Sequence, residues 1–378
     1  MDKATFGIIG VGGIAQSQHL PNLTRAPHVF LKTVCDLRAD VLARMQAKYR
    51  VPHATTDYRE VLADPEIAAV VVATREDMQA RLAAEALRAG KHVYVEKPLA
   101  DTPEKVEEVV AAEAESGRLA VVGFNRRMAP AYRKAAEIID ADQGPRNIHY
   151  RISDEYWSWG RNLPPRTRVI HEICHLFDLL RFFTHSDPLS IYCADSRPDD
   201  EVFVIRFPQC VASITDSGYV TMDLPKERLE MVGALGAVIV EEFVELRTYG
   251  YHRYEPVYRF AGHTHPDRDV THKYLLREGG AAALHALRRM GWEQRERWAR
   301  VQQGEAAADR PELELFQQRA PHWNYMVDKG WLAAIDHFAA CVLGGEPPQL
   351  ARARDGLWAA RMSAAAIQSR DSGQVVSF

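Results

Sequence analysis

The feature that most constrains the fold is a glycine-rich turn close to the start of the sequence. The stretch "GIIGVGGIA" places Gly10, Gly12 and Gly13 directly after an apolar run, and Ala15 takes the third small position of the pattern G-x-G-x-x-G/A. Gly10 permits a tight turn, and Gly12 lets the backbone approach a pyrophosphate closely. We therefore expect the amides of Gly12, Gly13 and Ile14 to bind the phosphates of a dinucleotide.

An acidic residue follows at the end of the second apolar run. Asp36, in "VCDLR", has roughly the spacing expected of a carboxylate that binds the adenosine ribose. Such a carboxylate accepts hydrogen bonds from both ribose hydroxyls and repels a 2′-phosphate, so the sequence favours NAD over NADP. Arg38 could pair with a 2′-phosphate, which leaves NADP open as an alternative.

Apolar runs alternate with helical patterns over the first third of the chain. The runs include "VFLKTVCD", "AAVVVAT" and "LAVVGFN", and amphipathic stretches such as "ADVLARMQAKYR" lie between them. Continuous β-branched runs are typical of parallel strands that are buried on both faces. We predict a doubly wound α/β Rossmann domain over residues 1–124.

From residue 125 onward the pattern changes to short strands with alternating polarity, such as "EVFVIRF" and "AVIVEEFVELRTY". This alternation predicts an α+β domain over residues 125–378, with an open, largely antiparallel sheet. The charged, His-rich stretch at about 252–325 is interpreted as an insertion. It is expected to be a solvated amphipathic segment or, alternatively, a lid or a subunit contact.

Composition excludes several classes of protein. A formal net charge of −4 gives no electrostatic case for binding nucleic acid or an anionic membrane. We see no signal peptide and no apolar run long enough to span a bilayer. The five cysteines are scattered and never form C-x-x-C, which indicates reduced thiols and a cytoplasmic location.

The stretch "VIHEICHLFDLL" contains an H-E-x-x-H pattern, formed by His171, Glu172 and His175. On a helix, two histidines four apart share a face and can hold zinc, with the glutamate as general base. A zinc hydrolase needs a third ligand, whereas this chain carries a nucleotide-binding pattern, so we expect no metal site. The His-rich stretch "HTHPDRDVTH" (263–272) is likewise interpreted as a solvated loop.

Four motifs in order carry a family resemblance: "GVGGIA", "GKHVYVEKPLA", "GFNRR" and "HEICHLFDLLRFF". With them the chain resembles the Gfo/Idh/MocA oxidoreductases, from residue 5 to roughly 250 and again at "DKGWLAAIDHFAACVLGG". The resemblance implies a Rossmann domain followed by a domain whose open sheet binds substrate and often pairs subunits. A homodimer or homotetramer formed through that sheet is therefore expected.

The resemblance also implies roles for individual residues. Lys97, in "EKP", is expected beside the nicotinamide and the reacting hydroxyl, where an ammonium stabilises developing alkoxide charge. His175 falls on the family's general acid/base, and Asp178 is interpreted as structural or orienting. Three further residues are expected to contact the cofactor, and these are Thr74, Glu96 and Asn125.

Besides "PPRTR", which stands where the family has a glycine run before the catalytic segment, the chain departs from the family pattern at two places. His171 stands where most members have a catalytic aspartate, so the proton relay could run through Lys97 and His175 alone, or His171 could join it. The family segment T-P-N-x-x-H keeps Thr74, but Arg75, Glu76 and Gln79 replace its other residues.

Four residues are candidates for binding the substrate together with His175. Trp157 and Trp159 could stack on the C–H faces of a sugar, or they could be buried in the core or in a subunit contact. Arg168 suits a carboxylate or phosphate, or a structural ion pair. Arg126 could approach the substrate, or it could be solvated at a hinge.

These patterns predict an NAD(P)-dependent dehydrogenase that acts on a carbinol of a sugar, cyclitol or related polyol. One alternative is a glycoside-processing enzyme that retains its NAD and oxidises the substrate only transiently. A second alternative is a non-catalytic regulator of the same fold that binds a nucleotide or sugar.

Overall fold

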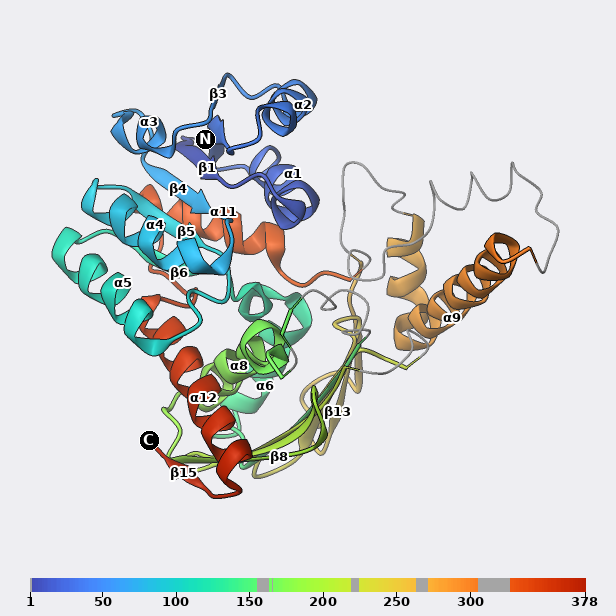
Figure 1. Cartoon of the computed structure of the whole chain (residues 1–378). Coiled ribbons are helices and arrows are strands. Elements are labelled where there is room, and N and C mark those ends of the chain that lie inside the picture. Colours follow the sequence, from blue (N-terminus) through green and yellow to red (C-terminus); the bar gives the residue numbers. More distant parts are fainter. Residues whose placement is uncertain (1, 155–162, 165, 219–223, 263–270, 305–326) are drawn as a thin grey trace. The chain divides into compact units, whose positions relative to one another are not determined.

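The computed structural model describes residues 2–154, 163–164, 166–218, 224–262, 271–304 and 327–378. These residues form two compact units, and the chain passes between the units more than once (Figure 1). Unit 1 comprises Met1–Met128, Val169–Asp187 and Gly330–Phe378, and unit 2 comprises Ala129–Arg168 and Pro188–Lys329. The predicted division into domains 1–124 and 125–378 stays a prediction.

Unit 1 is built on a sheet of six parallel strands in the order β3–β2–β1–β4–β5–β6. The strands are β1 (Ala4–Ile9), β2 (Val29–Cys35), β3 (His53–Thr55), β4 (Ala69–Val72), β5 (His92–Val95) and β6 (Ala120–Val122). Every residue of β4 is buried, as expected for a central strand covered on both faces. This order is that of a doubly wound dinucleotide-binding sheet, which confirms the predicted fold of the first part of the chain.

Helices pack on both faces of this sheet (Figure 1). They are η1 (Ala15–His19), α1 (Leu20–Leu23), α2 (Ala39–Tyr49), α3 (Tyr58–Ala63), α4 (Glu76–Arg88), α5 (Pro103–Ser116) and η2 (Asn125–Met128). One hydrophobic core contains Leu82 of α4 and Val106 of α5. The other core contains Leu20 of α1 and Val41 of α2.

Later segments of the chain complete unit 1. They are η3 (Val169–Ile173), α8 (Cys174–Thr184), α11 (Trp331–Val342), α12 (Ala353–Ser372) and β15 (Val376–Ser377). Phe338 of α11 packs edge-on against Phe6 of β1, with ring centroids 5.7 Å apart. Leu357 of α12 belongs to the same core as Val106. The C-terminal helices are therefore part of the core of the nucleotide-binding unit.

Unit 2 carries an open sheet, with its eight strands in the order β14–β13–β12–β11–β7–β10–β9–β8. They are β7 (Asn147–Ser153), β8 (Ser190–Arg197), β9 (Asp200–Arg206), β10 (Val211–Ser217), β11 (Glu227–Val232), β12 (Ala237–Glu241), β13 (Glu245–Tyr249) and β14 (Val257–Arg259). Only the pairing of β7 with β10 is parallel in this part of the sheet. Buried and exposed residues alternate along β9, so the predicted largely antiparallel, half-solvated sheet is confirmed.

The stretch "AVIVEEFVELRTY", predicted as one strand, forms the hairpin of β12 and β13 instead. Glu242 and Phe243 adopt left-handed backbone conformations, with φ of 55° and 64°. Two consecutive residues of this kind reverse the chain direction between paired strands. Neither position is a glycine or an asparagine, so the sequence did not indicate a turn there.

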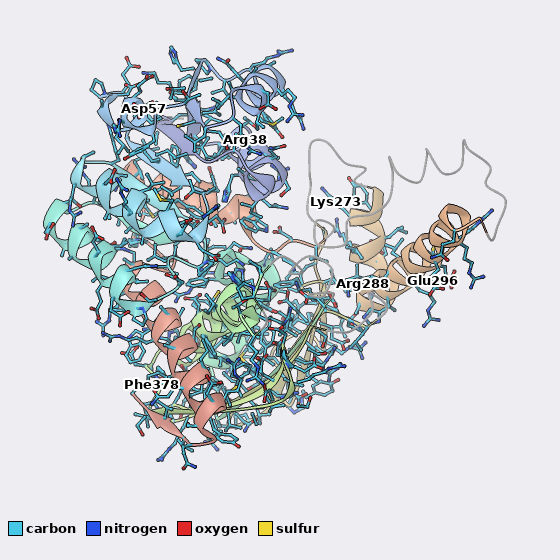
Figure 2. All side chains as sticks on the ribbon, viewed as in Figure 1. Arg38, Asp57, Lys273, Arg288, Glu296 and Phe378 are labelled. Carbon is cyan, nitrogen blue, oxygen red and sulfur yellow. The ribbon has the colours of Figure 1, made fainter. Side chains whose placement is uncertain are left out.

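The described residues of unit 2 also form the helices α6 (Pro130–Asp140) and α9 (Thr271–Gln302), and α9 bends at Gly280 (Figure 1). Leu276 and Leu284 of α9 are buried, and buried Arg288, labelled in Figure 2, donates to Glu242 at 2.7 Å. This part of the predicted insertion is therefore an amphipathic helix with one buried face, and Tyr274, Leu275 and Met290 are exposed. Within the part of the chain that the structure describes, none of the helices combines the length and apolar character needed to cross a bilayer.

Candidate active site

The glycine turn after β1 has the geometry that a dinucleotide requires. Gly10 has φ of 94°, and a Cβ there would lie 2.3 Å from the carbonyl oxygen of Ala73, so only glycine fits. A Cβ on Gly12 or Gly13 would meet no atom within 4 Å, which leaves open space beside the start of the helix. The N–H of Gln16 donates to the carbonyl of Gly12, so the helix begins at this turn. These residues fit the pyrophosphate of a dinucleotide.

Asp36 lies at the end of β2, beside the glycine turn. Its carboxylate accepts hydrogen bonds from the N–H of Val11 at 2.7 Å and from the N–H of Arg38 at 3.0 Å. The guanidinium of Arg38, labelled in Figure 2, also donates to it, with Nε 3.1 Å away. These bonds hold the pKa of Asp36 below its ordinary value, although burial opposes them. An ionised carboxylate is thus fixed where a ribose hydroxyl would bind.

Lys97 follows the buried strand β5 and lies at the carboxyl end of the parallel sheet, where such folds bind ligands. Its backbone N–H donates to Oε2 of Glu96 at 3.1 Å. Its Nζ donates to the backbone carbonyl of His171 at 2.6 Å. The structure therefore brings Lys97 next to the helical segment that carries the H-E-x-x-H pattern.

That segment begins with the π turn η3 and continues as α8. π turns inside helices are frequent at functional sites. His171 lies in the turn, while His175 is buried in the first turn of α8 and packs edge-on against Phe124, with ring centroids 5.7 Å apart. Cys174 precedes His175, and burial raises the pKa of its thiol to about 12. Cys174 is thus a neutral core thiol rather than a nucleophile.

The arginines of "GFNRR" are buried in ion pairs of unit 1. Nη2 of Arg126 donates to Oε1 of Glu172 at 2.9 Å, and both side chains are under 10% exposed. Arg127 forms two hydrogen bonds with Asp178, of which the one from Nε is 2.8 Å long. Asn125 is buried at the start of η2. A solvated hinge, the alternative interpretation of Arg126, is contradicted by this burial.

The remaining predicted residues lie elsewhere. Thr74 is half-buried after β4, and its hydroxyl donates to the carbonyl of Arg75 at 3.3 Å. Arg168 is fully buried in unit 2, where its guanidinium pairs with Asp216 and Asp154. These contacts support the structural ion pair that the sequence left open. Trp157 and Trp159 lie outside the described residues.

Among the residues that the structure describes, no group of three or more His, Cys, Asp or Glu side chains is arranged to hold a metal ion. The H-E-x-x-H residues have other partners, since Glu172 pairs with Arg126 and His171 contacts Glu76. Most of the stretch 263–272 falls outside the described residues.

Sequence reasoning missed three residues that shape this site. His19 is fully buried, and its Nε2 lies 2.6 Å from Oε1 of Glu96. The side-chain amide of Gln79 donates to the carbonyl of Pro98 at 2.6 Å, next to Lys97. Glu76 contacts His171. Glu76 and Gln79 could have been suspected because they depart from the family segment. Nothing in the sequence around His19 indicated a role in the site.

Comparison with known proteins agrees with this geometry. Residues 4–124 match the family described as "Oxidoreductase family, NAD-binding Rossmann fold" (GFO_IDH_MocA). Residues 4–124 thus carry the NAD-binding domain of the Gfo/Idh/MocA oxidoreductase family. The predicted resemblance to this oxidoreductase family and the predicted NAD-binding fold are thereby confirmed for residues 4–124.

Two curated relatives are similar to this chain. One is "Uncharacterized oxidoreductase YrbE" of Bacillus subtilis, 26% identical over 261 residues, which cover 62% of this chain and 73% of the relative. The other is the inositol 2-dehydrogenase of Salmonella typhimurium, 29% identical over 218 residues, which cover 56% of this chain and 64% of the relative. The chain thus matches just under two thirds of the length of the inositol dehydrogenase.

A solved structure matches the whole length of this chain. It is the WlbA dehydrogenase from Bordetella pertussis in complex with NADH and UDP-GlcNAcA, with a TM-score of 0.71 and 17% sequence identity. The similarity covers 100% of this chain and 98% of that protein. At this level of identity the match concerns the fold.

Proposed function

We propose that the protein is an NAD-dependent dehydrogenase that oxidises a secondary alcohol of a cyclitol, sugar or related polyol to the ketone, or catalyses the reverse reaction. The observation that carries the proposal is the bond of Lys97 Nζ to the helical segment that contains His171 and His175, in the same unit as the glycine turn. The inositol 2-dehydrogenases among the relatives support the substrate class.

In this proposal each residue of the site has one task. The ammonium of Lys97 donates a hydrogen bond to the carbinol oxygen and stabilises its developing negative charge. The imidazole of His175 receives the hydroxyl proton. NAD, when bound, supplies the acceptor for the hydride that leaves the carbon. Glu96 stays close to Lys97 through its bond to the Lys97 N–H, and we propose that it contacts the cofactor together with Thr74 and Asn125.

The choice of NAD rests on Asp36. Its carboxylate is fixed by the Val11 and Arg38 amides and faces the position of the ribose, where it repels a 2′-phosphate. Arg38 is engaged with Asp36 rather than directed at a phosphate. The sequence pattern supports Arg126, Trp157 and Trp159 as substrate contacts. Arg168 is assigned a structural role, because its guanidinium pairs with Asp216.

We further propose a homo-oligomer formed through the open sheet of unit 2, and a cytoplasmic location. Three apolar side chains on neighbouring strands of this sheet are exposed, and these are Tyr192, Val202 and Val204. An apolar sheet face of this kind is typical of a protein interface. The five cysteines, all within the described residues, are buried thiols, as expected in a reducing compartment.

An absorbance assay of NADH formation tests the function. The purified protein is assayed with cyclitols, sugars and sugar acids, using NAD and NADP separately. Lys97→Met is expected to lower kcat about 100- to 1,000-fold with the best substrate, because it removes one charge-stabilising donor. Lys105→Met is the matched control, since Lys105 is exposed and pairs with Asp101. Full activity of Lys97→Met, or no oxidation of any polyol by the wild type, contradicts the proposal.

A further inference from the structure

Glu76 and His171 form a contact that links two separate elements of unit 1. Glu76 is the first residue of α4, and His171 lies in the π turn η3. Nδ1 of His171 lies 3.2 Å from Oε2 of Glu76. The side chain of His171 is 11% exposed and that of Glu76 is 38% exposed, so the ring is enclosed while the carboxylate still reaches solvent.

The groups around the ring determine its charge. Burial and the neighbouring charge of Lys97 lower the pKa of His171 to about 4, and Glu172 opposes them. Burial, followed by the charges of Asp101 and Asp77, raises the pKa of Glu76, while Lys97 and Arg75 lower it. His171 is therefore a neutral imidazole at neutral pH, with a single N–H.

A neutral imidazole has one donor nitrogen and one acceptor nitrogen. Because Oε2 of Glu76 lies 3.2 Å from Nδ1, the negative carboxylate favours the form of the ring that carries its proton on Nδ1, and the lone pair is then on Nε2. A ring that protonates only in acid is a weak base at neutral pH but remains a good hydrogen-bond acceptor. Proton removal thus stays with His175, and His171 has a different task.

We propose that Glu76 is a positioning residue that holds His171 so that Nε2 accepts a hydrogen bond from a hydroxyl of the polyol substrate. The inference rests on the proposed function and extends it to substrate recognition. It also connects the two departures from the family pattern, because His171 replaces an expected aspartate and Glu76 replaces an expected asparagine. The pair supplies a hydrogen-bond acceptor at the position where the resemblance implies a carboxylate.

The first test does not depend on activity. Long-range proton–nitrogen NMR of protein labelled with nitrogen-15 in histidine reports which ring nitrogen of His171 carries the proton, and His171→Asn assigns the signal. We expect the Nδ1–H form and no protonation above about pH 5 in the wild type. A ring protonated on Nε2, or one that titrates near pH 6.5, overturns the inference and leaves the proposed function intact.

The second test compares the best polyol substrate with analogues that each lack one hydroxyl. In the wild type one deoxy analogue is expected to lose about tenfold or more in kcat/KM, because Nε2 then has no donor. Glu76→Ala is expected to lower kcat/KM about tenfold for the full substrate, chiefly through KM, and to have little effect on that analogue. Glu76→Gln keeps an amide oxygen as acceptor and is expected to fall between Glu76→Ala and the wild type.

Asp77→Asn is the matched control, because Asp77 lies in the same helical turn, is half exposed and pairs with Arg75. It is expected to keep wild-type kinetics. If Glu76→Ala lowers kcat/KM equally for the full substrate and for every deoxy analogue, the role of Glu76 is merely structural and the inference is overturned. Unchanged kinetics in Glu76→Ala overturn the inference as well. If His171 of the wild type carries its proton on Nδ1 as expected but the protein oxidises no polyol, the proposed function is contradicted instead.

Discussion

Gly10 and Gly12 are two residues apart and are glycines for different reasons. At Gly10 the left-handed backbone and the carbonyl of Ala73 leave no room for a side chain. At Gly12 the space around a Cβ is open, so the protein itself does not require glycine there. The vacant space is what a ligand's phosphates need. Fold and binding thus select the same residue type independently.

The two glycines can be separated by substitution. Gly10→Ala is expected to destabilise the fold by about 1–3 kcal/mol or more, because strain and overlap add. Gly12→Ala is expected to leave the urea midpoint almost unchanged and to weaken NAD binding at least about tenfold, since the methyl group occupies the approach to the pyrophosphate. Urea unfolding and titration calorimetry with NAD measure the two effects. An unfolded Gly12→Ala variant contradicts this separation.

His19 is a second residue with a defined task. Its ring is fully buried between Tyr94 and Trp331, with centroids 5.8 Å and 5.6 Å away, and it contacts the carboxylate of Glu96. Gly123 makes room for that carboxylate, because a Cβ there would lie 3.2 Å from Oε1 of Glu96. The Glu96 side chain, directly before Lys97 in the sequence, is thus held by its contact with His19 and fits into the space beside Gly123.

Replacing His19, the partner of Glu96, is expected to lower the free energy of unfolding. His19→Leu leaves a buried carboxylate oxygen without this donor and is expected to lose about 1–3 kcal/mol of unfolding free energy. His19→Gln keeps a polar hydrogen and is expected to lose less. Equal losses in the two variants, measured by urea unfolding, argue against the hydrogen bond as the stabilising element.

At the scale of elements, a network of charges joins η2, α8 and α12. Arg127 of η2 pairs with Asp178 of α8 and lies 3.2 Å from Asp355 of α12, which also accepts from Arg181 at 2.6 Å. Burial raises the pKa of Asp178 to about 6, although Arg127 opposes this. The network fixes α8, and with it His175, to the end of the unit 1 core.

Arg127→Ala tests the network. The substitution removes the guanidinium that pairs with the buried carboxylate of Asp178. Breaking a buried ion pair lowers the free energy of unfolding by about 3–5 kcal/mol. Losing Arg127 raises the pKa of Asp178 further, and an acid whose pKa is raised by folding lowers the stability of the fold as the pH rises towards that pKa. The loss is therefore expected to be larger at pH 8 than at pH 5 in urea unfolding. A loss that is the same at both pH values indicates that Asp178 is not the group involved.

At the scale of the whole molecule, unit 1 is assembled from three separate stretches of chain. Ile335 and Phe338 of α11 lie in one core of its sheet, and Ala353 and Leu357 of α12 lie in the other. The N-terminal stretch alone therefore lacks part of both cores.

A fragment of residues 1–128 is expected to unfold without a cooperative thermal transition and to bind a hydrophobic dye, whereas the full chain melts cooperatively. Circular dichroism and dye fluorescence measure both properties. A fragment that melts cooperatively and binds NAD would show that α11 and α12 are dispensable for the core.

Local patterns predicted the parts of the structure that depend on neighbouring residues. The glycine turn, Asp36 at the end of β2 and the doubly wound sheet were predictable because each follows from spacing and polarity within a βαβ unit. The turn at Glu242 and Phe243 was missed because neither residue favours a left-handed backbone. The contacts of Glu76 with His171 and of His19 with Glu96 join distant segments, which no local pattern reports.

The chain leaves unit 1 after Met128, returns for Val169–Asp187 and returns again at Gly330. The segment with His171 and His175 thus belongs to the same compact unit as the glycine turn, although a stretch of unit 2 separates the two in the sequence. A change in the length of that intervening stretch is therefore expected to leave the contact between Lys97 and the His171 carbonyl in place.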